Sequence, residues 1–258
     1  MTAQQNLPVV DEFEERKRKL EELRGAGIQA YPERFERTHT AAEARAEADK
    51  NPVRTVEEIV AQPGKTLNLA GRIVLMRAHG KLSFLQLQDS SGKIQVAFMQ
   101  DALGAEKYKM LKKIDMADFI GVSGELFMTK HGELTLLAKD YVLLSKTLRP
   151  MPEKFHGLAD QETKYRKRYL DTLTDPESFQ RFIFRSKLVA LMRRFLDDNG
   201  FLEVDTPILT NTASGATAKP FATHHNALDI DIYLSIACET YLKRAVVGGY
   251  ERVYNFAK

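Results

Sequence analysis

The side chains with the clearest capacity for chemistry in the first half of this 258-residue chain lie in the run LSFLQLQD. If this run is a β-strand, Phe84, Gln86 and Gln88 point to one face, and Leu85 and Leu87 point to the other. An aromatic ring on such a polar face can stack on a nucleic-acid base, which contributes roughly 1–3 kcal/mol per base. The run therefore predicts a surface able to bind an unpaired nucleotide.

Two residues outside this run extend the predicted surface. Gln95 points outward in the next predicted strand, KIQVAFM, and its amide offers both a donor and an acceptor to a base edge. Arg72, in the strand before the run, adds a positive charge. The alternative is an ordinary β-surface on which Phe84 packs beneath the N-terminal segment, and strand parity alone favours neither interpretation.

A second group of candidate residues lies near the C-terminal end. The small residues around Gly215 would let a backbone approach a ligand closely. Glu239 begins a helical pattern, where an acidic side chain normally only complements the helix dipole. His224 and His225 are adjacent on a predicted strand, so they point to opposite faces, and the chain has one cysteine, Cys238. We therefore predict no transition-metal site.

The apolar spacing predicts the elements that position the first group. From Thr66 onward Leu67, Ile73 and Leu75 share one parity, which indicates a half-buried strand with these side chains inward. The strands containing Phe84 and Gln95 follow, then a helical segment around 105–114 and strands near 119–129 and 134–144. Three strands, a helix and two strands predict a five-stranded OB barrel.

The remaining elements are mostly helical. Residues 11–24 form a charged helix, either a solvated surface helix or a basic arm that touches nucleic acid, and Thr55 can cap a short helix after it. A long helix carries an apolar stripe that must be buried. That helix ends at Asn199-Gly200, and a short strand then leads to Pro207. The stripe consists of Phe184, Leu188, Leu191, Met192 and Phe195.

Composition limits the class of protein. Hydrophobic residues make up 43% and charged residues 28% of the chain, as in ordinary soluble domains. The net charge of +3, with 38 basic residues, only weakly favours an anionic partner. The single cysteine fits a reducing compartment, and no apolar run approaches the roughly 20 residues needed to span a bilayer. We expect a cytoplasmic protein without a membrane partner.

Three stretches of the sequence resemble one family. The run from Phe184 to Leu234 resembles motif 1 of the class II aminoacyl-tRNA synthetases, and most closely that of the lysyl enzymes in class IIb. The stretch at 71–96 is similar to the anticodon-binding barrel of class IIb, and YRKRYLD at 165–171 resembles the start of the lysyl catalytic domain. The resemblance implies the ATP-dependent activation of lysine and its transfer to tRNA-Lys in translation.

The resemblance also implies roles for residues of the barrel. In class IIb the matching Arg, Phe and Gln contact the central uridine of the anticodon, and Arg72, Phe84 and Gln95 occupy those places here. Glu125, on the fourth predicted strand, is a weaker match to the same group.

In the second half, the segment around Gly215 resembles the lining of the amino-acid and ATP pocket, and Glu239 matches a glutamate that contacts the substrate amino acid. An ammonium group would donate a charge-assisted hydrogen bond to such a carboxylate. The long helix, the strand and Pro207 match the part of the family that builds a homodimer interface.

The expected architecture is therefore of the α+β class, with N-terminal helices and a barrel followed by the beginning of an antiparallel α/β catalytic domain. We expect a helical arm at 1–63, an OB-fold anticodon-binding domain at 64–147, a linker at 148–160 and a partial class II catalytic domain at 161–258.

The sequence departs from the family pattern in two respects. Ser214 stands where the family usually has glycine, Ser235 where it usually has arginine, and Cys238 where it has proline. Motifs 2 and 3, whose arginines hold the ATP phosphates, and the acidic residues that bind Mg²⁺ are not among these residues. We therefore expect this incomplete chain to be inactive alone, which a lysine-dependent pyrophosphate exchange assay would test.

Two other interpretations remain. The chain could be a non-catalytic tRNA-binding OB-fold protein derived from a synthetase, an interpretation that the changes at Ser235 and Cys238 favour slightly. It could also belong to the aspartate or asparagine enzymes of the same class. The THHNALD run at 223–229 favours the lysyl enzymes over both of these.

Overall fold

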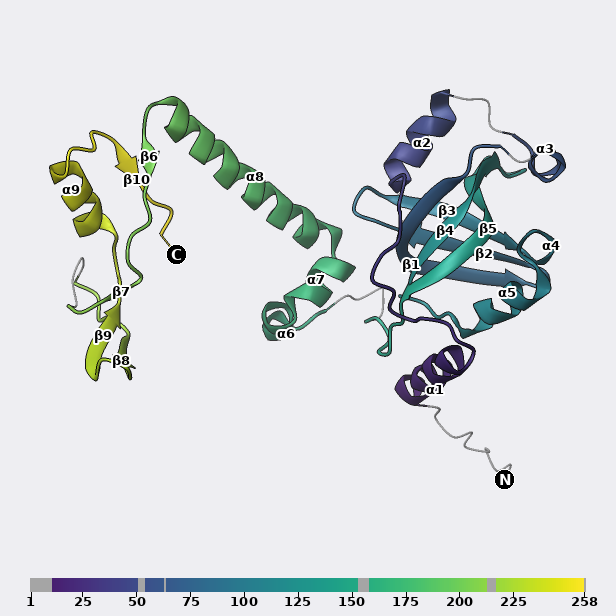
Figure 1. The fold of residues 1–258 in the computed structure, drawn as a ribbon, viewed down its shortest axis with the longest axis horizontal. Helices are drawn as coiled ribbons and strands as arrows, with labels where there is room; N and C mark the ends of the chain where they lie inside the picture. The colour runs from purple at the N-terminus through teal and green to yellow at the C-terminus, as the bar shows by residue number, and fades with distance from the viewer. Residues whose placement is uncertain (1–10, 51–53, 63, 153–157, 213–216, 258) are drawn as a thin grey trace. The chain divides into compact units, whose positions relative to one another are not determined.

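The computed structural model describes residues 11–50, 54–62, 64–152, 158–212 and 217–257. The chain divides into two compact units, Met1–Lys154 and Phe155–Lys258. Three helices of the first unit precede its sheet: α1 (Glu12–Gly25), α2 (Ala41–Lys50) and α3 (Val56–Ala61) (Figure 1).

Five strands form the sheet of the first unit: β1 (Leu67–His79), β2 (Leu82–Gln88), β3 (Lys93–Met99), β4 (Phe119–Met128) and β5 (Leu134–Ser145). Four of the pairings are antiparallel, and a parallel contact between β3 and β5 closes the barrel in the order β1-β2-β3-β5-β4 (Figure 1). Between β3 and β4 lie α4 (Gln100–Leu103), α5 (Ala105–Met110) and a 3-10 turn, Leu111–Lys113. The predicted barrel, with its helix between the third and fourth strands, is confirmed.

Alternation along the strands fills the barrel interior. Ile73, Val96, Phe98 and Ile120 are each fully buried, and burying an aliphatic or aromatic side chain of this size stabilises the fold by roughly 1.5–3 kcal/mol. The inward orientation predicted for Leu75 is wrong. A β-bulge between Ile73 and Leu75 shifts the register, so Leu75 lies outward and is 37% exposed.

A second, smaller apolar cluster lies on the outside of the barrel beneath α3. Thr55 forms the predicted N-cap as part of a capping box with Glu58. The helix then places Ile59 in a cluster with Phe127 and Leu137, which are all nearly fully buried. Phe84 packs against this cluster.

Helix α1 is held against the barrel by both apolar and charged contacts. Leu20 and Leu23 are buried in the main core. Arg16 is 4% exposed and donates to two backbone carbonyls of the barrel unit, Met116 O at 3.0 Å and Thr147 O at 3.2 Å. The helix is therefore packed on the barrel unit through one face, which differs from the solvated surface helix given as one of its two interpretations.

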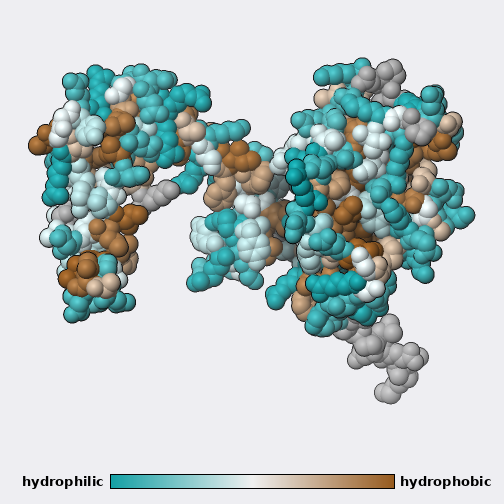
Figure 2. Space-filling view, viewed as in Figure 1, coloured by the Kyte–Doolittle hydropathy of each residue, from teal (hydrophilic) through white to brown (hydrophobic). Residues whose placement is uncertain are grey.

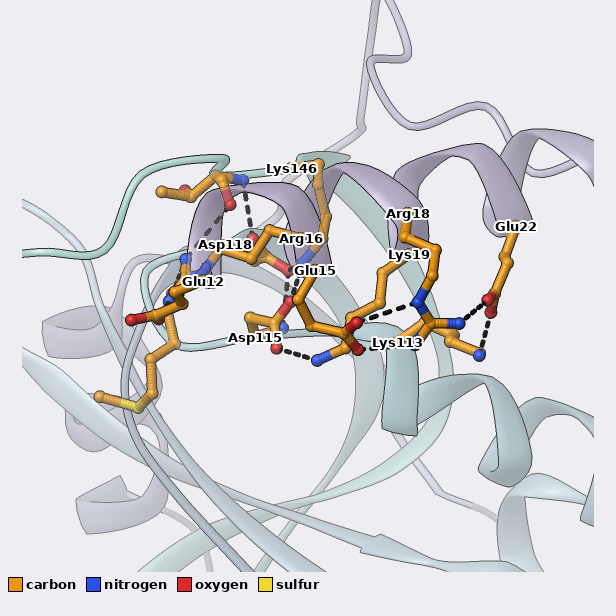
Figure 3. Close-up of polar contacts among 12 residues, drawn as sticks. Glu12, Glu15, Arg16, Arg18, Lys19, Glu22, Lys113, Asp115, Asp118 and Lys146 are labelled. Carbon is orange, nitrogen blue, oxygen red and sulfur yellow. Dashed lines mark hydrogen bonds and ion pairs between the residues drawn. The ribbon is translucent and has the colours of Figure 1, made fainter. Parts of the chain in front are cut away.

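Beside α1, two carboxylates share the ammonium group of Lys146 (Figure 3). Lys146 Nζ lies 2.6 Å from an oxygen of Asp115 and 2.7 Å from an oxygen of Asp118. Lys19 of α1 reaches Asp115 at 2.5 Å, and Lys113 pairs with Glu22 of α1. The side chains of Lys146 and Asp118 are completely buried. This group of Lys19, Asp115, Asp118 and Lys146 is called the α1 ion network below.

Acidification should weaken the α1 ion network. Burial acts to raise the pKa of Asp115, but hydrogen bonds from Lys146 and Lys19 outweigh it and bring that pKa below its ordinary value of 3.8. A lowered pKa means that the ionised form stabilises the folded state. The contribution of Asp115 is therefore complete above about pH 4 and is lost as the pH falls through its folded-state pKa.

The comparison to make is between the urea midpoints of the wild-type chain and of Asp115→Asn, near neutral pH and at about pH 3. The wild-type midpoint should fall further on acidification, because the variant has no carboxylate to protonate at this position. Equal falls in the two proteins would contradict the role given to Asp115.

The second unit begins with helices α6 (Gln161–Arg166), α7 (Arg168–Thr174) and α8 (Pro176–Asp198). Asp175 caps α8 through its side chain, and Pro176 occupies the first turn, where its missing N–H costs nothing. The helix ends at Asn199, and Gly200 takes a left-handed φ of 76°. The predicted end of this helix is confirmed.

Short strands and one helix follow α8: β6 (Leu202–Glu203), β7 (Leu209–Thr210), β8 (Ala222–His225), β9 (Ile230–Leu234), α9 (Glu239–Val247) and β10 (Val253–Tyr254). Strands β7, β9 and β8 form an antiparallel sheet in that order, and β10 pairs in parallel with β6. No helix in the described ranges has the length and hydrophobicity to cross a bilayer.

The apolar stripe of α8 is not buried in this structure. Phe184, Leu191 and Phe195 are 66%, 59% and 65% exposed, so the expectation of a buried stripe is wrong for the described residues. Figure 2 shows apolar residues, in brown, at the surface of this unit. A continuous apolar face of this kind typically marks a surface that another protein segment covers.

Candidate nucleic-acid interface

The outer surface of β1, β2 and β3 carries the residues predicted to bind a nucleotide. On β2, Phe84, Gln86 and Gln88 alternate with buried neighbours, as predicted. Antiparallel pairing places Arg77 opposite Phe84 and Arg72 opposite Gln88. Because paired residues of adjacent strands point to the same face, these side chains form one surface. It is called the outer face below and consists of Arg72, Leu75, Arg77, Phe84, Gln86, Gln88 and Gln95.

Phe84 lies outside the barrel interior and is half-buried. It is paired with Ala97 of β3 and packs against the cluster that Ile59 of α3 completes. The packing of Phe84 beneath the N-terminal segment, one of its two interpretations, therefore applies to the buried part of its ring. The rest of the ring is exposed on the outer face, where a base could stack on it.

Arg72 is held in place by its surroundings. Its Nη1 donates to the Ala117 carbonyl at 3.1 Å, and its guanidinium lies 4.2 Å from the centre of the Phe119 ring. Burial lowers the pKa of Arg72 below its ordinary value, but arginine starts so far above neutrality that the group keeps its charge. A cation fixed in this way can contact a phosphate or a base edge without a large loss of side-chain entropy.

Gln95 stands opposite Gln86 on β2 and opposite Thr135 on β5. Its Nε2 donates to Thr135 Oγ1 at 2.8 Å. Thr135 is fully buried and itself donates to the Glu133 carbonyl at 3.1 Å. The amide of Gln95 is thus tied to the strand beside it at one end.

Glu125 lies on β4 and is 3% exposed. Its carboxylate accepts from the Gly64 amide at 2.7 Å and from Arg54 at 3.2 Å, and it also pairs with Lys139. A Cβ at Gly64 would crowd the ends of the Arg54 and Glu125 side chains, which would have to shift to make room for it. The structure thus places Glu125 in an internal ion pair beside α3.

Three candidate residues belong to the second unit. Glu239 is the first residue of α9, and a hydrogen bond from Lys243, 2.6 Å away, lowers its pKa. Both side chains are exposed. Pro207 is exposed between β6 and β7, and Gly215 lies outside the described residues. Cys238 occupies the N-cap of α9 and provides no side-chain cap for it.

Comparison with known proteins agrees with this arrangement of parts. Residues 67–144 match the model of the OB-fold nucleic acid binding domain, and residues 160–258 match that of the class II tRNA synthetases for D, K and N. The lysine–tRNA ligase of Lactococcus lactis subsp. cremoris is 47% identical over 248 residues, which are 96% of this chain and 49% of that protein.

The chain belongs to the class II tRNA synthetases.

Other members of this family show the same extent of similarity. The lysine–tRNA ligases of Carboxydothermus hydrogenoformans and Streptococcus suis are 50% and 49% identical over 236 and 243 residues. These regions are 92% and 94% of this chain but 46% and 48% of those proteins. The synthetase chain therefore spans about half the length of the curated relatives that it matches. Its α+β fold combines the OB barrel with the beginning of the class II catalytic domain.

Sequence reasoning missed two residues of the synthetase's outer face. The hairpin turn at Gly80-Lys81 pairs His79 with Leu82, and counting back from it places Arg77 opposite Phe84. That signal is present in the sequence. The outward orientation of Leu75 depends on the bulge after Ile73, which the alternating pattern does not reveal.

The described part of this synthetase chain contains no group of three or more His, Cys, Asp or Glu side chains able to hold a metal ion. His224 pairs with Asp231 at 3.0 Å and with Asp229 at 3.3 Å, all at the surface. We assign no residue of this chain to Mg²⁺.

Proposed function

We propose that this chain serves in a lysine–tRNA ligase, which activates lysine with ATP and Mg²⁺ and transfers it to tRNA-Lys in the cytoplasm. Its barrel binds the anticodon through the outer face, on which Phe84 stacks on the central base. Arg72 contributes positive charge, and Gln95 hydrogen-bonds to the base edge. Support comes from the pairing of the strands, which gathers an aromatic ring, an amide and a fixed cation on one surface.

This arrangement suits an unpaired base. Single-stranded RNA is read by stacking on aromatic rings and by hydrogen bonds to the base edges. The ring of Phe84 packs on one side against the cluster that α3 covers, while Gln86 and Gln95 are paired directly across β2 and β3. A base stacked on the exposed part of the ring would therefore have amide side chains on the same face of the sheet.

Replacing Phe84 with alanine should weaken the binding of tRNA-Lys by about 5- to 150-fold, since stacking contributes roughly 1–3 kcal/mol per base. The measurement is a binding isotherm of the chain with the tRNA at one fixed salt concentration, because phosphate contacts make affinity salt-dependent.

Phe84→Leu is the matched control. Leucine preserves apolar packing against the cluster around Ile59 but has no aromatic face. We expect it to retain the wild-type urea midpoint and yet to bind the tRNA almost as weakly as Phe84→Ala. Wild-type affinity in both variants would remove the anticodon assignment.

For Glu125 we propose an indirect part in anticodon binding. Its carboxylate is already engaged by three donors from around α3 and β5. By fixing Arg54 and Gly64 it holds α3, and Ile59 of α3 belongs to the cluster against which Phe84 packs.

We further propose that Glu239 binds the ammonium group of lysine and that the segment at Gly215 lines the pocket for lysine and ATP. The exposed position of Glu239 at the start of α9 leaves its carboxylate accessible, with Lys243 as a partner that a substrate ammonium would replace. Isothermal titration of lysine against a full-length protein carrying Glu239→Gln should show the loss of this contact.

The last proposal is a homodimer built from α8 and the segment at Pro207. The apolar stripe of α8 supports it, since its five side chains are between 43% and 66% exposed in this unit. Sedimentation velocity at several protein concentrations tests it, because association would raise the sedimentation coefficient, and Leu191→Lys should reduce that rise.

A further inference from the structure

The two polar atoms of the Gln95 side-chain amide differ in their hydrogen bonding. Its Nε2 donates to Thr135 Oγ1 at 2.8 Å. Its Oε1 has no hydrogen-bond partner among the residues that the structure describes. Gln95 is only half-buried, so this open end faces the outer face rather than the barrel core.

The hydroxyl of Thr135 determines which atom of the Gln95 amide, nitrogen or oxygen, forms the hydrogen bond to it. A hydroxyl has one hydrogen, and that of Thr135 is donated to the Glu133 carbonyl at 3.1 Å. Its oxygen can therefore only accept from Gln95. A half-turn of the amide would bring Oε1 against Thr135 Oγ1 and would force the hydroxyl to give up Glu133.

Burial makes this arrangement costly to change. Thr135 is fully buried in β5, so bulk solvent cannot reach its Oγ1 to replace a lost partner. The hairpin between β4 and β5 is also fixed, since Thr129 donates its amide to the same Glu133 carbonyl at 3.0 Å. The acceptor that holds the Thr135 hydroxyl is therefore itself immobile.

We propose that Thr135 is a positioning residue that fixes the amide orientation of Gln95 and so determines which pyrimidine the outer face accepts. This inference rests on the proposed anticodon binding by Gln95. With Nε2 held by Thr135, the amide presents Oε1 as an acceptor and one remaining N–H as a donor, in a fixed order.

The order matters because uracil and cytosine present opposite patterns. Uracil carries an N–H donor at N3 beside the O4 acceptor, whereas cytosine carries an acceptor at N3 beside the amino donor at C4. For a base held in a fixed position, one orientation of the amide places its oxygen at N3–H and its N–H at O4 of uracil. Rotating the amide by 180° exchanges its oxygen and nitrogen, and the amide then matches cytosine. An amide free to rotate would accept both bases.

The test uses the 258-residue chain and two RNA hairpins that differ only at the central anticodon position, which is uridine in one and cytidine in the other. The quantity measured is the dissociation constant of the cytidine hairpin divided by that of the uridine hairpin, so a large ratio means preference for uridine. For Thr135→Val this ratio should fall by about fivefold or more, the lower end of the discrimination that a bidentate contact provides. Affinity for the uridine hairpin should change less than the ratio.

Thr135→Ser is the matched rescue, because serine keeps the hydroxyl and should restore the wild-type ratio. Valine is β-branched like threonine and is compatible with a strand. If Thr135→Val does not fold, Thr135→Ala carries the same prediction. Side-chain amide signals of Gln95 in ¹⁵N spectra, assigned by their loss in Gln95→Glu, should shift in the valine variant and return in the serine variant.

The two hypotheses fail in different ways. If the wild-type chain binds both hairpins equally or binds neither, the proposed anticodon function is wrong. If the wild-type chain discriminates and folded Thr135→Val or Thr135→Ala discriminates equally well, the role of Thr135 is wrong. Loss of discrimination that serine does not restore would also overturn it, because a merely structural effect would then explain the result.

Discussion

Replacing Lys146 with methionine should lower the free energy of unfolding of the barrel unit by about 3 kcal/mol or more. The ammonium of Lys146 is completely buried and contacts Asp115 and Asp118 at 2.6 and 2.7 Å. Its removal would leave the Asp118 carboxylate buried without a counter-charge. Burial already raises the pKa of Asp118, and the hydrogen bonds from the Asp115 amide, Lys146 and the Thr147 amide only partly offset this.

The measurement is native-state hydrogen exchange of the β4 and β5 backbone, which reports the largest opening free energy of the unit. The double variant Lys146→Met/Asp118→Asn is the control. It removes both charges. The Asp115 amide donates to one oxygen of Asp118 and the Thr147 amide to the other, and asparagine keeps only one of these acceptors, so the double variant should recover only part of the loss. A Lys146→Met protein as stable as the wild type would show that the α1 ion network contributes nothing.

Glu125→Ala should cost about 2 kcal/mol of stability and should also weaken RNA binding. The carboxylate is 3% exposed, but Arg54 and Lys139 keep about a third of their side-chain surface in water, so the loss is smaller than for Lys146. Without it, Arg54 would lose an anchor, while its other contacts hold the carbonyls of Glu58 and Gln62 at the end of α3. The apolar cluster of Ile59, Phe127 and Leu137, against which Phe84 packs, would then be less well ordered.

A double-mutant cycle separates an indirect role of Glu125 from direct contact with RNA. If Glu125 acts through Arg54 and α3, Arg54→Ala should weaken binding by a similar factor, and the double variant should lose little more than either single change. If Glu125 touched the RNA itself, the two effects on affinity would add. Urea midpoints measured on the same proteins ensure that affinities are compared between folded chains.

Local patterns in the sequence were sufficient to predict the barrel. Strand periodicity, the glycine turns and the helix between the third and fourth strands predicted its elements within a few residues, and Phe84 lies on the polar face as its parity indicated. These features depend on neighbouring residues, so a single sequence contains them. The same holds for the capping box at Thr55 and the end of α8 at Asn199.

The features that escaped prediction all depend on residues far apart in the chain. The charges of α1 look like a solvated pattern until Asp115 and Lys146, more than ninety positions away, are brought beneath them. The sequence pattern around Glu125 predicts only a strand residue with a free carboxylate. The fold brings Arg54 and Gly64 close enough to donate hydrogen bonds to that carboxylate. The exposed stripe of α8 has the spacing of a core helix, and periodicity cannot say which surface covers it.

The parallel contact between β3 and β5 has a consequence for the order of folding. Gln95 and Thr135 are separated by 40 positions, whereas β1–β2, β2–β3 and β4–β5 are joined by short turns. The pairing of β1 with β4, from Leu67 opposite Gly124 to Arg72 opposite Phe119, also joins distant residues. Because closing a long loop costs entropy before its contacts form, we expect the hairpins to assemble first and these two long-range pairings to form late. A nucleotide bound at Gln95 would then stabilise one of the two pairings that form late and slow its reopening.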